Sequence, residues 1–165
     1  MRHTDRPTAE EHIDIAAAPE RVWPHASDIA LSVGVSPELV SVEWVSGEGD
    51  APCVGREFVG TNTNAHFGTW QTTATVVECD EPHVFGWVVG DPAEPNTSWR
   101  YTLTPTPAGT RCTQWMQLGT GPSGLAIAVG RMPDKEERIV ANRMTQFRDW
   151  MRANLETIKQ RAESS

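Results

Sequence analysis

The sequence is poor in cysteine, and nothing in it points to a metal or cofactor site. Its three cysteines, Cys53, Cys79 and Cys112, are widely spaced and form no CxxC motif, which argues against a zinc site or a disulfide framework. The five histidines are scattered without metal-ligand spacing. Gly47-Glu48-Gly49 lacks the third glycine of a dinucleotide-binding loop. We therefore expect reduced thiols, no metal and no cofactor.

Basic charge and long apolar runs are also scarce. The chain has 14 Lys and Arg against 22 Asp and Glu, a net charge of −8, and such a chain is a poor partner for nucleic acid or an anionic membrane. The N-terminal residues MRHTDRPTAEEH contain no apolar signal-peptide segment. The apolar stretch from Leu125 to Val129 is too short to cross a bilayer. We expect a cytoplasmic protein with no nucleic-acid partner and no membrane insertion.

The overall composition is that of a globular protein. Hydrophobic residues make up 38% and charged residues 22% of the 165 residues, which predicts one folded domain over 1–165, with 1–9 as a flexible N-terminal tail. The chain has seven Trp but a single Tyr. Trp side chains line pockets and also fill ordinary cores.

Alternation of apolar and polar residues predicts seven strands. They cover Glu11–Ala16, Val40–Trp44, Gly55–Asn64, Thr69–Cys79, His83–Val89, Thr97–Thr104 and Arg111–Leu118. Short turns rich in Gly, Pro and Asp join the last six, so we expect them to form an antiparallel meander.

The helical signals lie near the two ends of the chain. Ala18 to Trp23 predicts a short helix, limited or kinked by Pro24, and Ile29 to Val35 predicts a second short helix or a turn. After Pro133, apolar residues recur every three or four positions up to about Arg161, which predicts a helix of about 40 Å. This apolar stripe comprises Val140, Met144, Phe147, Met151, Leu155 and Ile158. Gly119 to Arg131 is expected to be a glycine-rich connection able to act as a mobile gate.

Several short segments in this order resemble a known family. They are Ala18-Pro19-Glu20-Arg21-Val22-Trp23, Val54-Gly55 with Phe58, Gly60 and Asn62, then Trp70, Thr72 and Val76, Phe85-Gly86-Trp87, Trp99-Arg100-Tyr101, and Gly109-Thr110-Arg111-Cys112-Thr113. From about Glu11 to Ala162 the chain resembles the START/Bet v 1-like (SRPBCC) superfamily, within it the bacterial polyketide cyclase/dehydrase and lipid-transport family. The resemblance implies an α+β helix-grip fold, in which a curved antiparallel sheet of about seven strands wraps round a long C-terminal helix, with two short helices after the first strand.

The same resemblance implies an internal cavity for a small hydrophobic ligand, lipid-like or polyketide-like. Members of the superfamily include carriers of lipids and sterols, hormone receptors, and aromatase/cyclases that use an arginine inside the cavity. Arg100 falls on the polar face of its strand, and Arg143 borders the apolar stripe of the last helix. Neither is matched to a catalytic arginine, so binding, cyclase or dehydratase activity, and a partner-binding role with a vestigial cavity all remain open.

The candidate ligand-binding residues are inward-facing aromatic, methionine and amide side chains. They are Trp44, Phe58, Asn62, Trp70, Trp87, Trp99, Tyr101, Gln114, Met116, Met144, Phe147 and Met151. The alternative for any of them is a solid core. We expect Asn62 and Gln114 either to orient a ligand carbonyl or hydroxyl, or to satisfy each other or the backbone.

Two further residues, His66 and Trp115, each have two possible roles. His66, near a predicted turn with Asn64, is either a general acid or base at the cavity rim or a solvated side chain. Trp115 faces away from the predicted interior and is a candidate homodimer contact, unless a loop covers it. No catalytic residue is assigned.

Overall fold

The strands form one seven-stranded sheet in which every neighbouring pair is antiparallel. The computed structural model describes residues 1–165, and the strand order across the sheet is β1-β7-β6-β5-β4-β3-β2. The strands are β1 (Thr8–Ile15), β2 (Leu39–Trp44), β3 (Glu57–Asn64), β4 (Gly68–Asp80), β5 (Val84–Val89), β6 (Thr97–Thr106) and β7 (Gly109–Leu118). The helices are α1 (Pro19–Ala26), α2 (Gly124–Arg131) and α3 (Glu136–Ser164), with 3-10 turns η1 (His3–Asp5) and η2 (Pro133–Lys135). The seven predicted strands and the antiparallel meander are confirmed.

Strand β7 shows how the alternation of apolar and polar residues in the sequence determines which face of the sheet is buried. Thr110, Cys112, Gln114, Met116 and Leu118 alternate along it and are all buried, whereas the residues between them are less covered. Alternate side chains of a strand point to opposite faces, so these five share the inner face. Trp115, on the outer face, is partly covered by Arg100, whose guanidinium lies 4.7 Å from the ring centre.

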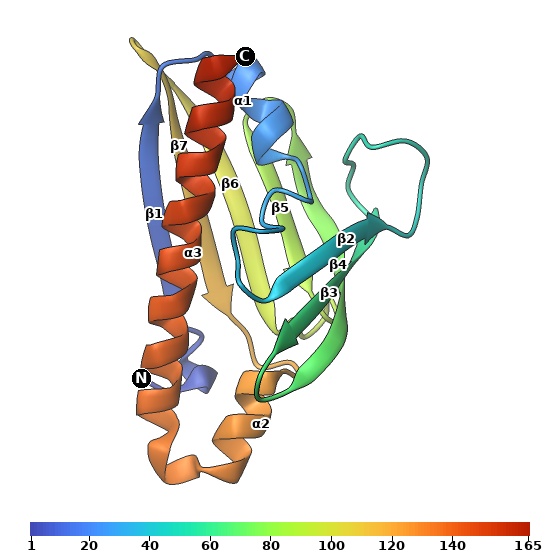
Figure 1. Cartoon of the computed structure of the whole chain (residues 1–165), viewed down its shortest axis with the longest axis vertical. Coiled ribbons are helices and arrows are strands. Elements are labelled where there is room, and N and C mark those ends of the chain that lie inside the picture. The colour runs from blue at the N-terminus through green and yellow to red at the C-terminus, as the bar shows by residue number, and fades with distance from the viewer.

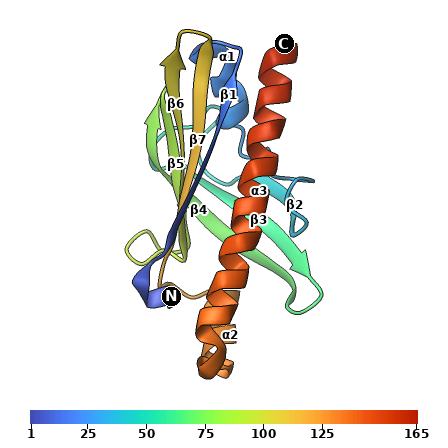
Figure 2. The ribbon, with the colours of Figure 1, turned by 90° about the vertical axis from the view of Figure 1, so that its left-hand side faces the viewer.

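Helix α3 packs its predicted apolar stripe onto the sheet. All six residues of the stripe, from Val140 to Ile158, are buried. The helix makes its main contacts with β1, β7, α1 and α2 and runs the length of the molecule (Figure 1). In profile, β3 and β4 pass behind α3 and reach beyond it, so the sheet curls round the helix (Figure 2). This is the helix-grip arrangement that the resemblance implies.

The apolar core falls into two clusters rather than one. The larger lies between α1, the C-terminal end of α3 and the sheet, and contains Val22, Trp23 and Leu103 among its buried members. The smaller joins β1 and β7 to the N-terminal half of α3 and contains Met116 and Met151. Register shifts between Val76 and Glu78 in β4 and between Leu39 and Ser41 in β2 interrupt the ladders of the curled flank. Such bulges bend a strand locally.

Three expectations from the sequence are wrong in part. The segment Ile29 to Val35 forms turns with an isolated bridge, which is one of its two expected alternatives, and the second short helix that the resemblance implies is absent. The Asp28 carboxylate accepts from the Ala30 N–H and Gly34 adopts a φ of 82°, which suits turns. The expected connection 119–131 contains helix α2, which begins where the Ser123 hydroxyl caps the Ala126 N–H.

The expected flexible tail over 1–9 is also too long. Thr8 and Ala9 belong to β1, and the Ala9 side chain is buried. Ahead of them, the backbone N–H and Nδ1 of His3 lie 3.2 and 2.9 Å from the Glu136 carboxylate at the start of α3. None of the helices combines the length and the apolar character needed to cross a membrane.

Candidate functional site

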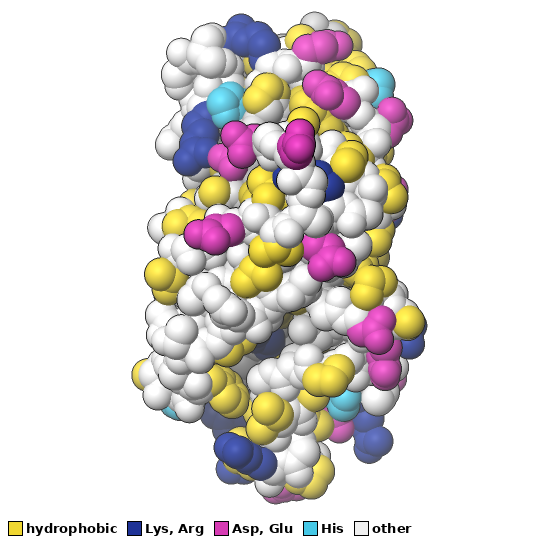
Figure 3. All heavy atoms as spheres, turned by 90° about the vertical axis from the view of Figure 1, so that its right-hand side faces the viewer, with side chains coloured by type: hydrophobic (Ala, Val, Ile, Leu, Met, Phe, Trp, Pro, Cys, Tyr) yellow, Lys and Arg dark blue, Asp and Glu magenta, His cyan; other side chains and the backbone are white.

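The concave side of the sheet encloses a cavity of about 1120 Å³. Its walls come from the inner face of β3 to β7, from α3 and α2, and from the segment 28–38 between α1 and β2, which we call the 28–38 segment. A recess is visible on the side of the molecule that carries β2, β3 and α2 (Figure 3). This volume is slightly above the usual range of about 300–1,000 Å³ for small-molecule sites.

The cavity has a closed end at the middle of β5, β6 and β7. Phe85, Tyr101 and Gln114 line it there. One step further along the inner face, Leu103 and Cys112 are paired in the sheet, almost fully buried, and outside the lining. The solid core therefore begins directly behind Tyr101 and Gln114.

Aromatic rings form the sheet wall of the cavity. Trp87 and Trp99, directly paired on β5 and β6, are stacked with ring centres 6.3 Å apart. Phe147 of α3 meets Trp99 edge-on at 5.3 Å, and Phe58 packs against Trp87 at 6.4 Å. The Trp99 indole N–H donates to the Thr97 hydroxyl at 2.9 Å, which fixes the ring orientation. Such edge-on and offset contacts suit a rigid wall for a flat or apolar molecule.

The rim of the cavity is formed by the β3–β4 hairpin and by α2. The Asn64 carboxamide accepts from the N–H groups of His66 and Phe67 at 2.9 and 2.7 Å, which shapes the hairpin. His66 is exposed there, as the solvated interpretation predicts. Phe67 lies beside Gly124 at the start of α2 and is 45% exposed, so an apolar side chain faces the opening.

Glycines at the start of the 119–131 connection serve close packing. A Cβ at Gly119 or Gly121 would lie 2.0 Å from the Pro95 carbonyl oxygen or 2.3 Å from that of Glu94. Both glycines also donate backbone hydrogen bonds to the loop that contains residues 94–96. These two positions hold the loops together, whereas the sequence suggested that they allow movement.

An ion pair that sequence reasoning missed lies on the cavity wall. The Arg143 guanidinium donates from Nη1 and Nη2 to both Glu38 oxygens, at 3.0 and 3.1 Å. It also lies 4.7 and 5.0 Å from the ring centres of Phe147 and Trp150. The only signal in the sequence was the position of Arg143 beside the apolar stripe. Its partner, Glu38, lies in a segment whose backbone conformation the sequence does not predict.

The 28–38 segment has two more polar links to α3. The Ser32 hydroxyl donates to Asn154 Oδ1 at 3.0 Å, and Asp28 lies 3.5 Å from Arg161. Together with the Glu38–Arg143 pair, these contacts fasten the 28–38 segment along the helix. They close one side of the cavity with polar bonds that add to the apolar packing of Leu31 in the larger core cluster.

The structure brings most of the predicted ligand-binding residues to the cavity. Those that line it are Phe58, Asn62, Trp70, Trp87, Trp99, Tyr101, Gln114 and Phe147. The expectation for Met116, Met144 and Met151 is not met, because these side chains fill the smaller core cluster between α3 and the sheet. The Gln114 Oε1 atom has no hydrogen-bond partner, so Asn62 does not satisfy it.

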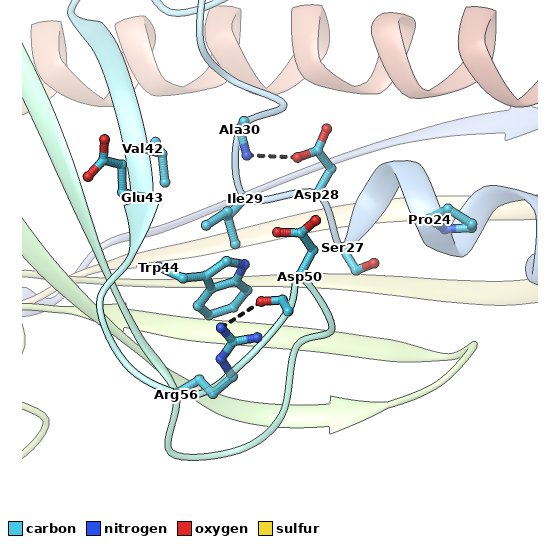
Figure 4. A pocket seen from close by; sticks show the side chains of 12 residues that line it. Pro24, Ser27, Asp28, Ile29, Ala30, Val42, Glu43, Trp44, Asp50 and Arg56 are labelled. Atoms are coloured by element: carbon cyan, nitrogen blue, oxygen red, sulfur yellow. Dashed lines mark hydrogen bonds between the residues drawn. The ribbon is translucent and has the colours of Figure 1, made fainter.

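Trp44, also predicted to bind ligand, lines a separate pocket of about 790 Å³. It packs behind Phe58, with ring centres 5.5 Å apart, and Arg56 stacks on it at 3.9 Å (Figure 4). Arg56 is 6% exposed and donates to the carbonyls of Ser46 and Gly49, both at 2.9 Å. This arrangement orders the loop between β2 and β3. It accounts for the position of Trp44 without a bound ligand.

Burial controls the ionisation of the groups behind the aromatic wall. It raises the pKa of the Tyr101 hydroxyl well above the ordinary value of 10.0, so this hydroxyl stays protonated at neutral pH. It also raises the pKa of the Cys112 thiol to about 12. No group of three His, Cys, Asp or Glu side chains is close enough to hold a metal ion.

Comparison with known proteins identifies the family. The model of the family "Polyketide cyclase / dehydrase and lipid transport" matches residues 6–163. Among curated proteins, none matches the chain. Among solved structures, the Polyketide_cyc-like protein Cgl2372 from Corynebacterium glutamicum is 29% identical over 94% of this chain and 91% of its own, with a TM-score of 0.65.

Two more distant structures share the fold. The di-domain ARO/CYC BexL from the BE-7585A biosynthetic pathway is 17% identical over 96% of this chain and 50% of its own, with a TM-score of 0.68. Ara h 8.0201 is 16% identical over 96% of this chain and 99% of its own, with a TM-score of 0.59. The chain therefore belongs to the polyketide cyclase/dehydrase and lipid-transport family, with the helix-grip α+β fold of the Bet v 1-like (SRPBCC) superfamily.

Proposed function

We propose that this protein binds a small hydrophobic molecule, lipid-like or polyketide-like, in the cavity under the curled sheet. The observation that carries the proposal is the cavity itself, about 1120 Å³ with a stacked Trp87–Trp99 wall. Hydrophobic side chains make up 21 of its 44 lining residues, which suits a ligand with an apolar body and a few polar groups.

The charged groups of the lining favour binding over turnover. Glu38 and Arg143 neutralise each other, and Asp28 faces Arg161. His66 and Arg131 are exposed at the rim. A general acid or base acts best when it contacts the reacting group with a pKa near the working pH. Deep in the cavity the one ionisable side chain is Tyr101, which burial keeps protonated.

Native mass spectrometry of the purified protein tests this proposal directly. We expect a co-purifying small molecule that is released on denaturation. Titration with an apolar fluorescent probe gives a second measurement, in which Trp99→Ala should weaken binding by about ten-fold, since an aromatic contact contributes about 1 kcal/mol beyond its buried area. Trp115→Ala, on the outer face, is the matched control and should leave affinity unchanged. A wild-type protein that carries no co-purifying molecule and does not bind the fluorescent probe would contradict the proposal.

The second candidate is a polyketide aromatase/cyclase or dehydratase that acts on a ligand held in the same cavity. The observation that favours it is the position of Arg143 on the cavity wall. From the sequence alone, Arg143 is matched to no catalytic arginine. The test is incubation with a poly-β-keto thioester and mass spectrometry for loss of water. Turnover that disappears in Arg143→Met or His66→Ala, while probe binding persists, would place this candidate ahead of simple binding.

A further inference from the structure

We propose that the closed end of the cavity receives a hydroxyl group attached to a ring of the ligand, held between Tyr101 and Gln114. This inference rests on the proposed function and names the chemical class of the ligand: a hydroxylated aromatic or polycyclic molecule in preference to a plain hydrocarbon or an ether. The hydroxyl would accept from the Tyr101 O–H and donate to the Gln114 carboxamide oxygen.

The first support is the position of the two side chains. Tyr101 and Gln114 are directly paired in the β6–β7 ladder, so both point from adjacent strands to the inner face. Both line the cavity, and they are 3% and 1% exposed. Behind them lie Leu103 and Cys112, which have no strong polar group to offer.

The second support is that both polar groups lack partners. Gln114 Oε1 is the one buried side-chain nitrogen or oxygen in the structure with no hydrogen-bond partner. The Tyr101 hydroxyl takes part in none of the side-chain hydrogen bonds, which elsewhere occupy groups such as Trp99 Nε1 and Asn154 Oδ1. Buried polar groups are otherwise almost always paired. An unpaired buried oxygen beside a Tyr101 hydroxyl that makes no hydrogen bond therefore indicates a missing polar partner.

The residue paired with Gln114 on the neighbouring strand β1 does not satisfy its carboxamide. Its neighbour on the opposite strand of the sheet is Glu11, but the Glu11 carboxylate bonds to Arg152 at 2.9 Å and Arg148 at 3.4 Å on α3. Rotation about the last side-chain bond of Gln114 turns either its oxygen or its amide nitrogen toward the cavity, without moving the strand.

The chemistry of the closed end selects a neutral hydroxyl. The charged side chains of the lining, Asp28, Glu38, Arg131 and Arg143, belong to α2, α3 or the 28–38 segment, and none comes from β5, β6 or β7. The strands that carry Phe85, Tyr101 and Gln114 therefore offer a charged ligand group no opposite charge to offset its desolvation. Burial keeps the Tyr101 hydroxyl protonated and therefore a donor. A hydroxyl both donates and accepts, as this pair requires, whereas an ether accepts only. The rings of Phe85 and Trp87 flank the position and suit a ligand ring.

The experiment compares 2-naphthol with 2-methoxynaphthalene by calorimetric titration of the full chain. We expect the wild type to bind the naphthol about ten-fold more tightly, since a site built for a hydroxyl discriminates against an analogue that cannot donate. Gln114→Met should abolish this preference and keep affinity for the ether. Tyr101→Phe should reduce the preference. Gln117→Met, the same change on the outer face of the same strand, should leave the preference unchanged.

The outcomes separate this inference from the proposed function. Equal affinities in the wild type, or a preference that persists in Gln114→Met, would overturn the inference while leaving ligand binding intact. A wild type that binds neither compound nor an apolar probe would overturn the proposed function as well. Thermal unfolding gives a second measurement: Gln114→Met removes an unsatisfied buried oxygen, so the melting temperature should be unchanged or higher, and a clear decrease would show that Gln114 is already satisfied.

Discussion

Arg143 on α3 and Glu38 before β2 form a two-point ion pair on the cavity wall, with nitrogen–oxygen distances of 3.0 and 3.1 Å. Their side chains are 26% and 15% exposed. The main packing contacts of α3 are with β1, β7, α1 and α2, so this pair joins the helix to a part of the molecule that it does not pack against extensively. The pair is therefore well placed to control access to the cavity.

We expect Arg143→Met to speed release of a bound apolar probe by about ten-fold, because it removes this link and loosens the Glu38 end of the 28–38 segment, while the Ser32–Asn154 and Asp28–Arg161 contacts remain. The free energy of unfolding should fall by only about 1 kcal/mol, since the pair keeps some contact with solvent. Stopped-flow dilution gives the release rate, and urea denaturation gives the stability.

A double-mutant cycle with Glu38→Gln isolates the pair itself. The matched control is the Asp28–Arg161 pair, which joins the same segment to α3 at 3.5 Å with side chains 40% and 45% exposed. Removal of that pair should show no measurable coupling. Release rates that are unchanged in Arg143→Met would show that the probe leaves by another route.

The buried methionines should affect stability without affecting ligand binding. Met151 is 0% exposed in the core cluster with Met116 and outside the cavity lining. Met151→Ala should therefore lower the free energy of unfolding by about 2–5 kcal/mol. Probe affinity, measured where the variant is fully folded, should match the wild type. A loss of affinity comparable to that of Trp99→Ala would instead indicate that Met151 belongs to the binding site.

The close approach of Gly121 to the loop around Glu94 predicts a steric effect. Its Cβ position lies 2.3 Å from the Glu94 carbonyl oxygen, so Gly121→Ala should force the two loops apart and destabilise the protein by about 1–3 kcal/mol. The change is expected to raise amide hydrogen exchange at the rim first. Gly130→Ala, in α2 with nothing within 4 Å of its Cβ position, should be neutral or stabilising by up to about 1 kcal/mol. Equal effects in the two variants would refute the steric argument.

Buried thiol chemistry predicts a loss of stability at high pH. The Cys112 thiol of the folded protein has its pKa raised from 9.0 to about 12 by burial. Between these values the unfolded chain has released the proton and the folded chain still holds it. Stability is therefore fully retained below pH 9 and falls as the pH rises toward 12, by at most about 1.4 kcal/mol per pH unit from this group. Tyr101 acts in the same direction above pH 10.

Urea denaturation from pH 8 to 11 measures this slope. Cys112→Ala should give a shallower decline than the wild type. Cys53→Ala is the control, because Cys53 is exposed, and its decline should match the wild type. Identical slopes for all three proteins would exclude Cys112 as a source of the pH dependence.

The strands and α3 could be predicted because their signals are local. A period of two in β7 and a stripe of period three to four in α3 follow from how side chains project from each element. The missed helix α2 shows the limit of this approach. Its glycines at 124 and 130 reduce helix propensity, and only the Ser123 cap marks its start.

Whether an inward side chain fills the core or lines the cavity could not be predicted from the sequence. Gln114 and Met116 are two residues apart on the same face of β7. Only Gln114 lines the cavity, because α3 covers Met116. That difference depends on where the helix crosses the sheet, which is a long-range property. The Glu38–Arg143 pair was missed for the same reason, since its partners are 105 positions apart.

The curled flank of the sheet has a consequence for the range of molecules that fit. Strands β2 to β4 are joined to the rest through backbone ladders interrupted at Val76–Glu78 and Leu39–Ser41, while the dense apolar contacts of α3 lie on β1 and β7. A small tilt of this flank would enlarge or shrink the cavity, while Phe58, Ala74 and Val76 keep the flank attached to the larger core cluster. We therefore expect the proposed cavity to accept ligands of different size, with selectivity among them set by the few polar atoms of the rigid strands.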